Sequence, residues 1–290
     1  MTASPAGRVV VCPTPIGNLG DVSERVLDAL RTADVVACED TRRTRVLLDR
    51  YGISRPTVSM HEHNEAARSA ELVERALAGE RVAVVSDAGM PTVSDPGARL
   101  VSEALRAGLA VEVLPGPSAV TTALAASGLA AGGFVFGGFL PRGAARVRAE
   151  VERLDAAGLP LVAFESPKRL PSTLQTLASA WPDRLAAVCR ELTKLHEEVA
   201  RGPLGALAER FAEPPRGEIT LVLAPAPAQP AAVDLEALAE LAGAVGTRQA
   251  ADLAARLTGA PRNALYAAVT ARKARGRPDR PGTRGRPSGP

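Results

Sequence analysis

Short apolar segments alternate with amphipathic stretches throughout the first half of the chain, and this alternation constrains the possible folds more than any other feature. The segments are rich in β-branched residues, as strands are, and they lie at residues 8–12, 35–38, 57–60, 81–86 and 111–114. Strands that alternate with helices are typical of a mostly parallel sheet covered by helices. The alternation therefore predicts an N-terminal α/β domain over residues 1–130.

The second half of the chain has a similar set of apolar segments, at residues 134–140, 161–165, 185–192, 196–202 and 217–225. Helices are predicted near residues 143–157, 167–180 and 203–212. Because several of these strands follow one another with little chain between them, we predict a mixed sheet in a second α/β domain, residues 131–225. The boundary between the two domains is expected near Gly128–Gly133.

The remainder of the chain predicts a linker, a helical module and a tail. Residues 226–233 are mostly Pro and Ala, and proline fixes φ and removes an N–H donor, so this segment is predicted to be a linker. A helical module is expected over residues 234–272, with helices near 234–242, 247–258 and 261–272. Gly246 and Gly259 separate these helices with a spacing that resembles a helix-turn-helix. Residues 273–290 are rich in Arg, Gly and Pro and are predicted to be a disordered basic tail.

Composition narrows the class of protein. The net charge is +3, but residues 272–290 contain seven Arg or Lys and one Asp, so residues 1–271 have a net charge of −3. Three widely separated cysteines, Cys12, Cys38 and Cys189, are typical of buried thiols in a reducing compartment. No apolar run approaches the roughly 18 residues of a membrane helix, and the N-terminus lacks a signal-peptide pattern. We expect a cytoplasmic protein without a membrane segment.

Polar or glycine-rich residues follow each of the five strands predicted for the first domain, at residues 13–21, 39–42, 61–64, 86–97 and 115–119. Ligands of open α/β sheets bind beyond the carboxyl ends of the strands, so these loops predict a ligand site along one edge. The chain has no G-x-x-x-x-G-K-[ST] motif and no G-x-G-x-x-G after the first strand. A P-loop nucleotidase and a Rossmann dehydrogenase are therefore disfavoured.

Several of these loops also have a purely structural interpretation. Asp95-Pro96 and Pro117-Ser118 are typical of helix starts, and Asp40 or Thr41 could cap a helix. His61 and His63 alternate along one predicted strand end, which would point them to opposite faces and make them poor ligands for one metal ion. No metal site is predicted.

Taken together, the motifs carry a family resemblance. They are PTPIGNLGD (13–21), EDTRRT (39–44), HEHNE (61–65), SDAGMPTVSDPG (86–97), LPGPSAVTTALAASGL (114–129), GFLPR (138–142), FESPKRL (164–170) and RELTKLHEE (190–198). In this order they resemble the ribosomal small subunit methyltransferase I family, whose sheet design is similar to that of the tetrapyrrole methylases and diphthine synthases. The resemblance spans nearly all of residues 8–225, and RNALYAAV (262–269) resembles the family's C-terminal helices.

The resemblance implies a fold, a reaction and partners. It implies two α/β domains of the tetrapyrrole methylase type with S-adenosylmethionine in the cleft between them. The methyl group would go to the ribose 2′-oxygen of a cytidine in the decoding region of 16S rRNA, in the small ribosomal subunit, and the protein would be a homodimer. The donor would contact Pro15, Asp87, Ala88, Gly89, Met90, Pro115, Gly116, Ser118, Ala119, Phe164, Leu192 and Ile219. Phe164 stands where many members place tyrosine.

The chemistry of these residue types suits a methyl transfer. Free N–H groups at a helix start near Ser118 and Ala119 could hold the donor's carboxylate, Asp87 could accept hydrogen bonds from the donor, and Gly89 and Gly116 permit close backbone approach. A ribose hydroxyl is a poor nucleophile until a base draws its proton away. The candidate bases are Glu39, Asp40, His63 and Glu165.

Basic side chains on the same loops are candidates for RNA phosphate contacts: Arg42, Arg43, Lys168, Arg169, Arg190 and Lys194. The alternative is a set of solvated surface charges. Two other functions remain open at this point. A tetrapyrrole C-methyltransferase would need an apolar, macrocycle-sized pocket. A ligand-sensing nucleic-acid-binding regulator would depend on the helical module and the tail.

Overall fold

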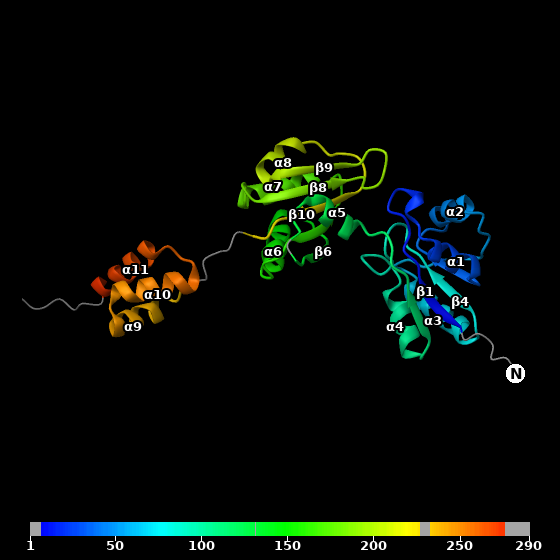
Figure 1. The fold of residues 1–290 in the computed structure, drawn as a ribbon, viewed down its shortest axis with the longest axis horizontal. Coiled ribbons are helices and arrows are strands. Elements are labelled where there is room, and N and C mark those ends of the chain that lie inside the picture. The colour runs from blue at the N-terminus through cyan, green and yellow to red at the C-terminus, as the bar shows by residue number, and fades with distance from the viewer. Residues whose placement is uncertain (1–6, 131, 227–232, 276–290) are drawn as a thin grey trace, which may run out of the picture. The chain divides into compact units, whose positions relative to one another are not determined.

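The computed structural model describes residues 7–130, 132–226 and 233–275, and the side chains up to Arg272. The chain forms two compact units, residues 1–226 and 227–290, and each is described by itself (Figure 1). Most of the predicted linker, residues 227–232, and the predicted tail from residue 276 onward lie outside the described residues.

The first sheet of the larger unit has five parallel strands in the order β3-β2-β4-β1-β5. The strands are β1 (Arg8–Val11), β2 (Val35–Cys38), β3 (Thr57–Ser59), β4 (Arg81–Val84) and β5 (Ala110–Val113). Each lies within a residue or two of its predicted position. The parallel sheet predicted from the alternating pattern is confirmed.

Helices cover both faces of the first sheet. They are α1 (Glu24–Thr32), α2 (Thr41–Arg50), α3 (Glu65–Leu77) and α4 (Ala98–Arg106). Successive strand residues face opposite sides, so Val10 is buried in a core with α1 and α2, whereas Val9 is buried in a core with α3 and α4. This two-sided burial explains why the strands are almost entirely apolar.

The second sheet is mixed, as predicted, with the order β6-β7-β10-β8-β9. Its strands are β6 (Val135–Phe139), β7 (Leu161–Glu165), β8 (Leu185–Arg190), β9 (Glu198–Pro203) and β10 (Ile219–Leu223). β6 and β7 are parallel, and the other neighbours are antiparallel. One face is covered by α6 (Ala144–Asp155), α7 (Leu170–Ala180) and α8 (Leu204–Arg210).

The helix α5 (Ala119–Ser127) covers the other face of the second sheet. Its Val120 and Ala123 are buried in one cluster with Val162 and Val222 (Figure 1 shows α5 beside β8 and β10). α5 is therefore the first element of the chain that packs on the second sheet, although it precedes the boundary expected near residues 128–133. α5 therefore belongs with the second sheet and not with the first.

The smaller unit contains the helices α9 (Leu235–Val245), α10 (Thr247–Thr258) and α11 (Arg262–Arg275). They share a small core that includes Leu238, Ala250 and Leu265. The predicted C-terminal helical module is confirmed, and Gly246 and Gly259 lie between its helices. Among the described residues, no helix is long and apolar enough to cross a membrane.

Candidate functional site

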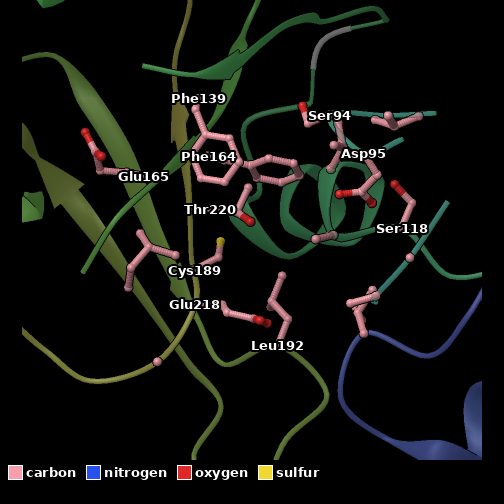
Figure 2. A pocket seen from close by; sticks show the side chains of 18 of the residues that line it. Ser94, Asp95, Ser118, Phe139, Phe164, Glu165, Cys189, Leu192, Glu218 and Thr220 are labelled. Carbon is pink, nitrogen blue, oxygen red and sulfur yellow. The ribbon is translucent and has the colours of Figure 1, made fainter. Parts of the chain in front are cut away.

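The main cavity of residues 1–226 has a volume of about 300 Å³ (Figure 2). It is lined by the loops that follow β4 and β5 and by residues of the second sheet and its loops. Part of the polar edge predicted at the strand ends of the first sheet therefore borders a cavity: the loops after β1, β4 and β5 contribute residues, and the loops after β2 and β3 do not. The second sheet supplies much of the remaining wall.

The turn of residues 88–90, after β4, forms one part of the wall. Gly89 has φ +82°, and a Cβ on it would lie 3.3 Å from Ile16 Cγ2 and 4.0 Å from Ser118 Cα. The Gly89 N–H donates to Thr14 O (3.0 Å), and the Thr14 N–H donates to Gly89 O (2.9 Å). This position favours glycine because of its backbone conformation and its close neighbours, and the paired hydrogen bonds fix the turn against the loop after β1.

The loop of residues 92–97 holds Asp95 at the cavity. Thr92 (φ +74°) and Ser94 (φ +65°) adopt the left-handed region, which is uncommon for residues with a side chain. The Gly97 N–H donates to Glu65 Oε1 at 2.8 Å. Because α4 begins only at Ala98 with Gly97 as its N-cap, the helix-cap interpretation of Asp95 is wrong.

The start of α5 forms another part of the wall. Ser118 is the N-cap, as its sequence context predicts, but its hydroxyl makes no capping hydrogen bond. Ser118, Ala119 and Val120 all line the cavity. The first N–H groups of a helix have no partner within the helix, so this end of α5 offers donors and the positive end of the helix dipole to an anionic group.

The second sheet supplies an aromatic and apolar wall. The Phe164 ring lies between Phe136 (centroids 5.1 Å apart) and Phe139 (5.4 Å). Phe139 and Phe164 line the cavity together with Leu192 and Ile219, and 61% of Phe139 remains exposed. A mostly apolar wall with a few polar groups is typical of a site for an organic ligand.

The cavity brings together eight of the twelve residues predicted to contact the donor. They are Ala88, Gly89, Met90, Ser118, Ala119, Phe164, Leu192 and Ile219. These residues come from sequence segments more than 100 positions apart. Their convergence on one cavity is the main feature that the sequence interpretation and the structure share.

The other four predicted donor contacts lie elsewhere. Pro15 and Asp87 line a separate hollow of about 70 Å³, where Asp87 Oδ1 accepts a hydrogen bond from the Asp40 N–H (3.0 Å) and Oδ2 pairs with Arg43 (3.4 Å). Pro115 and Gly116 line neither space. A Cβ on Gly116 would lie 2.4 Å from Pro13 Cγ, so packing against Pro13 requires glycine there.

Glu165 belongs to the cavity wall, but its carboxylate is engaged by neighbouring groups. Oε2 accepts a hydrogen bond from Thr173 Oγ1 (2.6 Å), and Oε1 accepts one from the Ser166 N–H (2.6 Å). The Arg169 guanidinium pairs with Oε1 at 3.0 Å, and the Glu165 side chain is completely buried. Figure 2 shows this carboxylate pointing away from Phe164. These contacts make Glu165 a structural carboxylate.

The other predicted bases do not line the main cavity. Asp40 caps α2, as the structural interpretation proposed, and hydrogen bonds from Arg42 hold the pKa of Asp40 well below its usual range. Burial raises the pKa of Glu39, and the nearby Asp87 carboxylate raises this pKa further. His63 is exposed on the turn before α3.

The expectation that His61 and His63 face opposite ways is wrong. Both residues lie beyond the end of β3 at Ser59, so strand alternation does not apply to them. Their ring centroids are 6.0 Å apart in an edge contact. Within the described ranges, no group of three or more His, Cys, Asp or Glu side chains is placed to hold a metal ion.

The six predicted RNA contacts divide into two groups. Arg169, Arg190 and Lys194 pair with Glu165, Glu198 and both Glu191 and Glu218, respectively. Arg42 is 88% exposed, although it also pairs with Asp40, and Arg43 and Lys168 are exposed too. The exposed group can reach a phosphate without breaking a buried interaction.

The sequence interpretation missed Asp95 as a cavity residue. Burial and the Glu39 carboxylate raise the pKa of Asp95 to about 6, against the opposing effect of a hydrogen bond from Ser86. Ser94, Phe139, Glu218 and Thr220 also line the cavity and were not predicted. Only the ligand-site character of residues 86–97 could have directed attention to Asp95.

Comparison with known proteins places the chain in a family. A family model of tetrapyrrole (corrin/porphyrin) methylases matches residues 8–208. A ribosomal RNA small subunit methyltransferase I from Mesorhizobium japonicum is 47% identical over 259 residues, which cover 87% of this chain and 88% of the relative. This chain belongs to the ribosomal RNA small subunit methyltransferase I family. The family resemblance predicted from the ordered motifs is confirmed.

Other relatives define the extent of the match. A ribosomal RNA small subunit methyltransferase I from Thermotoga maritima is 46% identical, and the match covers 98% of that relative but 75% of this chain. A model described as the RsmI C-terminal HTH domain matches residues 227–273. The helix-turn-helix character predicted for the module therefore agrees with a domain type found in this family.

Solved structures of lower identity share the fold. A diphthine synthase matches with a TM-score of 0.60 and 20% identity over 74% of this chain and 89% of that chain. A uroporphyrin-III C-methyltransferase from Thermus thermophilus, complexed with S-adenyl homocysteine, matches with a TM-score of 0.55 and 21% identity over 75% of this chain and 97% of that chain. The tetrapyrrole methylase fold predicted from the motifs is confirmed.

Proposed function

We propose that this protein transfers a methyl group from S-adenosylmethionine to RNA of the small ribosomal subunit. The acceptor is the ribose 2′-oxygen of a cytidine in the decoding region of 16S rRNA, and the enzyme acts in the cytoplasm as a homodimer. The observation that carries the proposal is the convergence of eight predicted donor contacts on one cavity. The names of relatives that are 37–47% identical support the reaction class and the ribosomal RNA acceptor.

The residues of the main cavity fit the parts of S-adenosylmethionine. The N–H groups at the start of α5 suit the carboxylate of its methionyl part. The apolar walls near Phe164 and Ile219 suit its adenosine part, and the glycine turn at Gly89 lets backbone groups approach it closely. A related fold binds S-adenyl homocysteine, the product that the donor becomes.

The cavity also suits the charge change of the reaction. The donor's sulfonium loses its positive charge as the methyl group leaves, so a carboxylate held tightly against the sulfur would stabilise the starting state more than the transition state. Apolar side chains and backbone groups around the sulfur avoid that cost. Alignment of hydroxyl oxygen, methyl carbon and sulfur can then supply a large part of the rate increase.

Exposed basic residues support an RNA acceptor. Arg42, Arg43 and Lys168 are the exposed members of the predicted set, although Arg42 pairs with Asp40 and Arg43 with Asp87, so we assign RNA binding to these three. The ion pairs of Arg169, Arg190 and Lys194 favour a structural role for those residues. Binding of this kind weakens steeply as salt concentration rises.

The two alternative functions have less support. Solved tetrapyrrole and diphthine enzymes among the structural matches are 14–23% identical to this chain, which is far below the identity of the ribosomal RNA relatives. A ligand-sensing regulator would not need a cavity lined by the residues that the methyltransferase motifs predict. Both alternatives remain outcomes of the test.

The test compares donor binding and methyl transfer in two variants of α5. Ala119→Phe places a ring in the cavity, whereas Ala125→Phe adds the same ring on an exposed position of the same helix. We expect Ala119→Phe to lose donor binding by calorimetry and methyl transfer to small ribosomal subunits, and Ala125→Phe to retain both. Equal donor affinity in the two variants would place the donor elsewhere, and transfer only to a tetrapyrrole would establish that alternative.

A further inference from the structure

Of the residues that the structure describes, three with carboxylates line the main cavity, and one of the three has no ion pair with a basic side chain. Glu165 is engaged by Thr173 and Arg169, and Glu218 pairs with Lys194 at 2.9 Å. Within the part of the chain that the structure describes, Asp95 forms no ion pair. The Ser86 hydroxyl lies beside it and also donates to the backbone oxygens of Ala88 and Gly89, so lone pairs of the Asp95 carboxylate remain available to a ligand.

We propose that Asp95 is the general base that accepts the proton of the acceptor hydroxyl during methyl transfer. This inference rests on the proposed function. It replaces the four bases predicted from the sequence, because Glu39, Asp40 and His63 do not line the cavity and the Glu165 carboxylate is engaged by its neighbours.

The position of Asp95 suits a base at this site. It lies in the loop after β4, close in sequence to the 88–90 turn that is expected to hold the donor. In Figure 2 the side chains of Asp95 and Ser118 project into the cavity from the side opposite Glu165. A base must lie within hydrogen-bond reach of the proton that it takes, and Asp95 is the free carboxylate with access to this space.

The backbone around Asp95 fixes that position. Thr92 and Ser94 have positive φ, Pro96 restricts the residue before it, and the Gly97 N–H is held by Glu65. Non-glycine residues in the left-handed region are strained, and such residues cluster at functional sites. The strained backbone therefore belongs to the loop that fixes the position of the Asp95 carboxylate.

The electrostatic surroundings keep Asp95 basic. Glu39 after β2, Asp87 after β4 and Glu218 before β10 are the charged groups that act on it, and Arg43 pairs with Asp87. Burial and these negative charges raise the pKa of Asp95 to about 6, although the Ser86 hydrogen bond lowers it. A carboxylate with this pKa is ionised at neutral pH and accepts a proton more readily than an ordinary aspartate.

The step balances in atoms and charge. The hydroxyl O–H bond breaks, and its proton moves to a carboxylate oxygen of Asp95. The oxygen forms a bond to the methyl carbon while the methyl–sulfur bond breaks, and the electron pair of that bond stays on sulfur. The products are the 2′-O-methyl ribose, S-adenosylhomocysteine and a protonated Asp95, which releases its proton to solvent.

The experiment measures single-turnover methyl transfer to small ribosomal subunits between pH 5 and pH 8. The full-length wild type is compared with Asp95→Asn, Asp95→Glu and the control Asp49→Asn, which changes an exposed carboxylate on α2. The wild-type rate should rise with pH and level off above about pH 6. The rate of Asp95→Asn should be roughly 10²- to 10⁴-fold lower than that of the wild type, and its pH profile should have no inflection. Its affinity for S-adenosylmethionine, measured by calorimetry, should change little. Asp95→Glu should recover part of the rate and the inflection.

Several results would overturn the inference. The first is a flat pH profile in the wild type, and the second is near-normal methyl transfer by Asp95→Asn. The third is a loss of donor affinity in Asp95→Asn equal to its loss of rate, because such a loss would mean that Asp95 binds the donor. The pH profile of the wild type tests the role of Asp95 even if a variant does not fold. Failure of the wild type to transfer methyl groups contradicts the proposed function, whereas transfer without dependence on Asp95 contradicts only this inference.

Discussion

Arg169 illustrates how burial separates residues that stabilise the fold from residues that can bind a substrate. From the sequence, Lys168 and Arg169 are equivalent candidates for a phosphate contact. In the structure Arg169 pairs with the completely buried Glu165 and donates to Leu140 O and Pro141 O, whereas Lys168 is exposed. The difference depends on which of the two side chains points inward. The residue types at positions 168 and 169 do not indicate this.

Replacement of Arg169 by Ala should destabilise the protein. Loss of the guanidinium leaves the Glu165 carboxylate buried with only Thr173 and Ser166 as partners, which costs about 3 kcal/mol in the free energy of unfolding. Urea denaturation followed by circular dichroism measures this change. Lys168→Ala is the control, with stability unchanged and RNA binding weaker at low salt. A loss below about 1 kcal/mol in Arg169→Ala would contradict the structural role.

Replacement of Asp95 by Asn should stabilise the folded state at neutral pH. The folded-state pKa of about 6 lies above the usual value near 4, so the contribution of Asp95 to stability is present below about pH 4 and is lost as pH rises through about 6. Because Asp95 is partly exposed, screening reduces the effect to about 1 kcal/mol. Denaturation of both proteins at pH 4 and pH 7.5 tests this, and an equal difference at the two pH values would contradict it.

The position of Asp95 at the cavity could not be predicted from the sequence. Asp-Pro before a helix is typical of an N-cap, but α4 starts at Ala98, after a loop in which Thr92 and Ser94 have positive φ. Those residue types do not indicate such a loop. Gly89 was predictable because a glycine in a polar turn after a strand already signals close backbone approach.

At the scale of elements, the strands were predictable and the partner of α5 was not. Strands buried on both faces consist of continuous apolar residues, so β1, β2 and β4 are evident in the sequence. α5 is apolar around most of its surface, so its sequence does not tell which sheet it covers. Tertiary packing against Val162 and Val222 decides that it belongs with the second sheet.

Gly17→Ala tests a contact between loops from the two sheets. The Asn18 N–H donates to Thr193 Oγ1 (3.0 Å), and a Cβ on Gly17 would lie 2.7 Å from that oxygen and 2.9 Å from Leu192 O. Leu192 lines the cavity. We therefore expect weaker donor binding in calorimetry and a loss of about 1–3 kcal/mol in stability.

Gly20→Ala is the matched control for Gly17→Ala. A Cβ on Gly20 would meet only Asn18 Oδ1, at 3.2 Å, so both measurements should stay close to the wild type. Unchanged donor affinity in Gly17→Ala would show that the loop containing Leu192 can shift without effect on the cavity.

The whole molecule consists of two compact units, one that contains the main cavity and one that is helical. The main cavity lies entirely within residues 1–226. The Thermotoga maritima relative matches over 98% of its own length, yet the match covers only 75% of this chain. The remaining quarter of this chain therefore lies outside the match to that relative.

Truncation after Ala226 should leave donor binding intact. The shortened protein is expected to bind S-adenosylmethionine within about twofold of the full-length affinity, because the truncation removes none of the residues that line the cavity. Calorimetry measures the affinity, and circular dichroism confirms folding. A folded truncated protein that does not bind the donor would show that the helical module contributes to the donor site, and would favour the regulator alternative.

A crystal structure of the protein with S-adenosylhomocysteine would show where the methyl donor binds. We expect density for the compound in the main cavity, with its carboxylate at the start of α5 near Ala119 and its adenosine part against Phe164 and Ile219. Density for the compound at another surface, with this cavity empty, would show that the cavity is not the donor site.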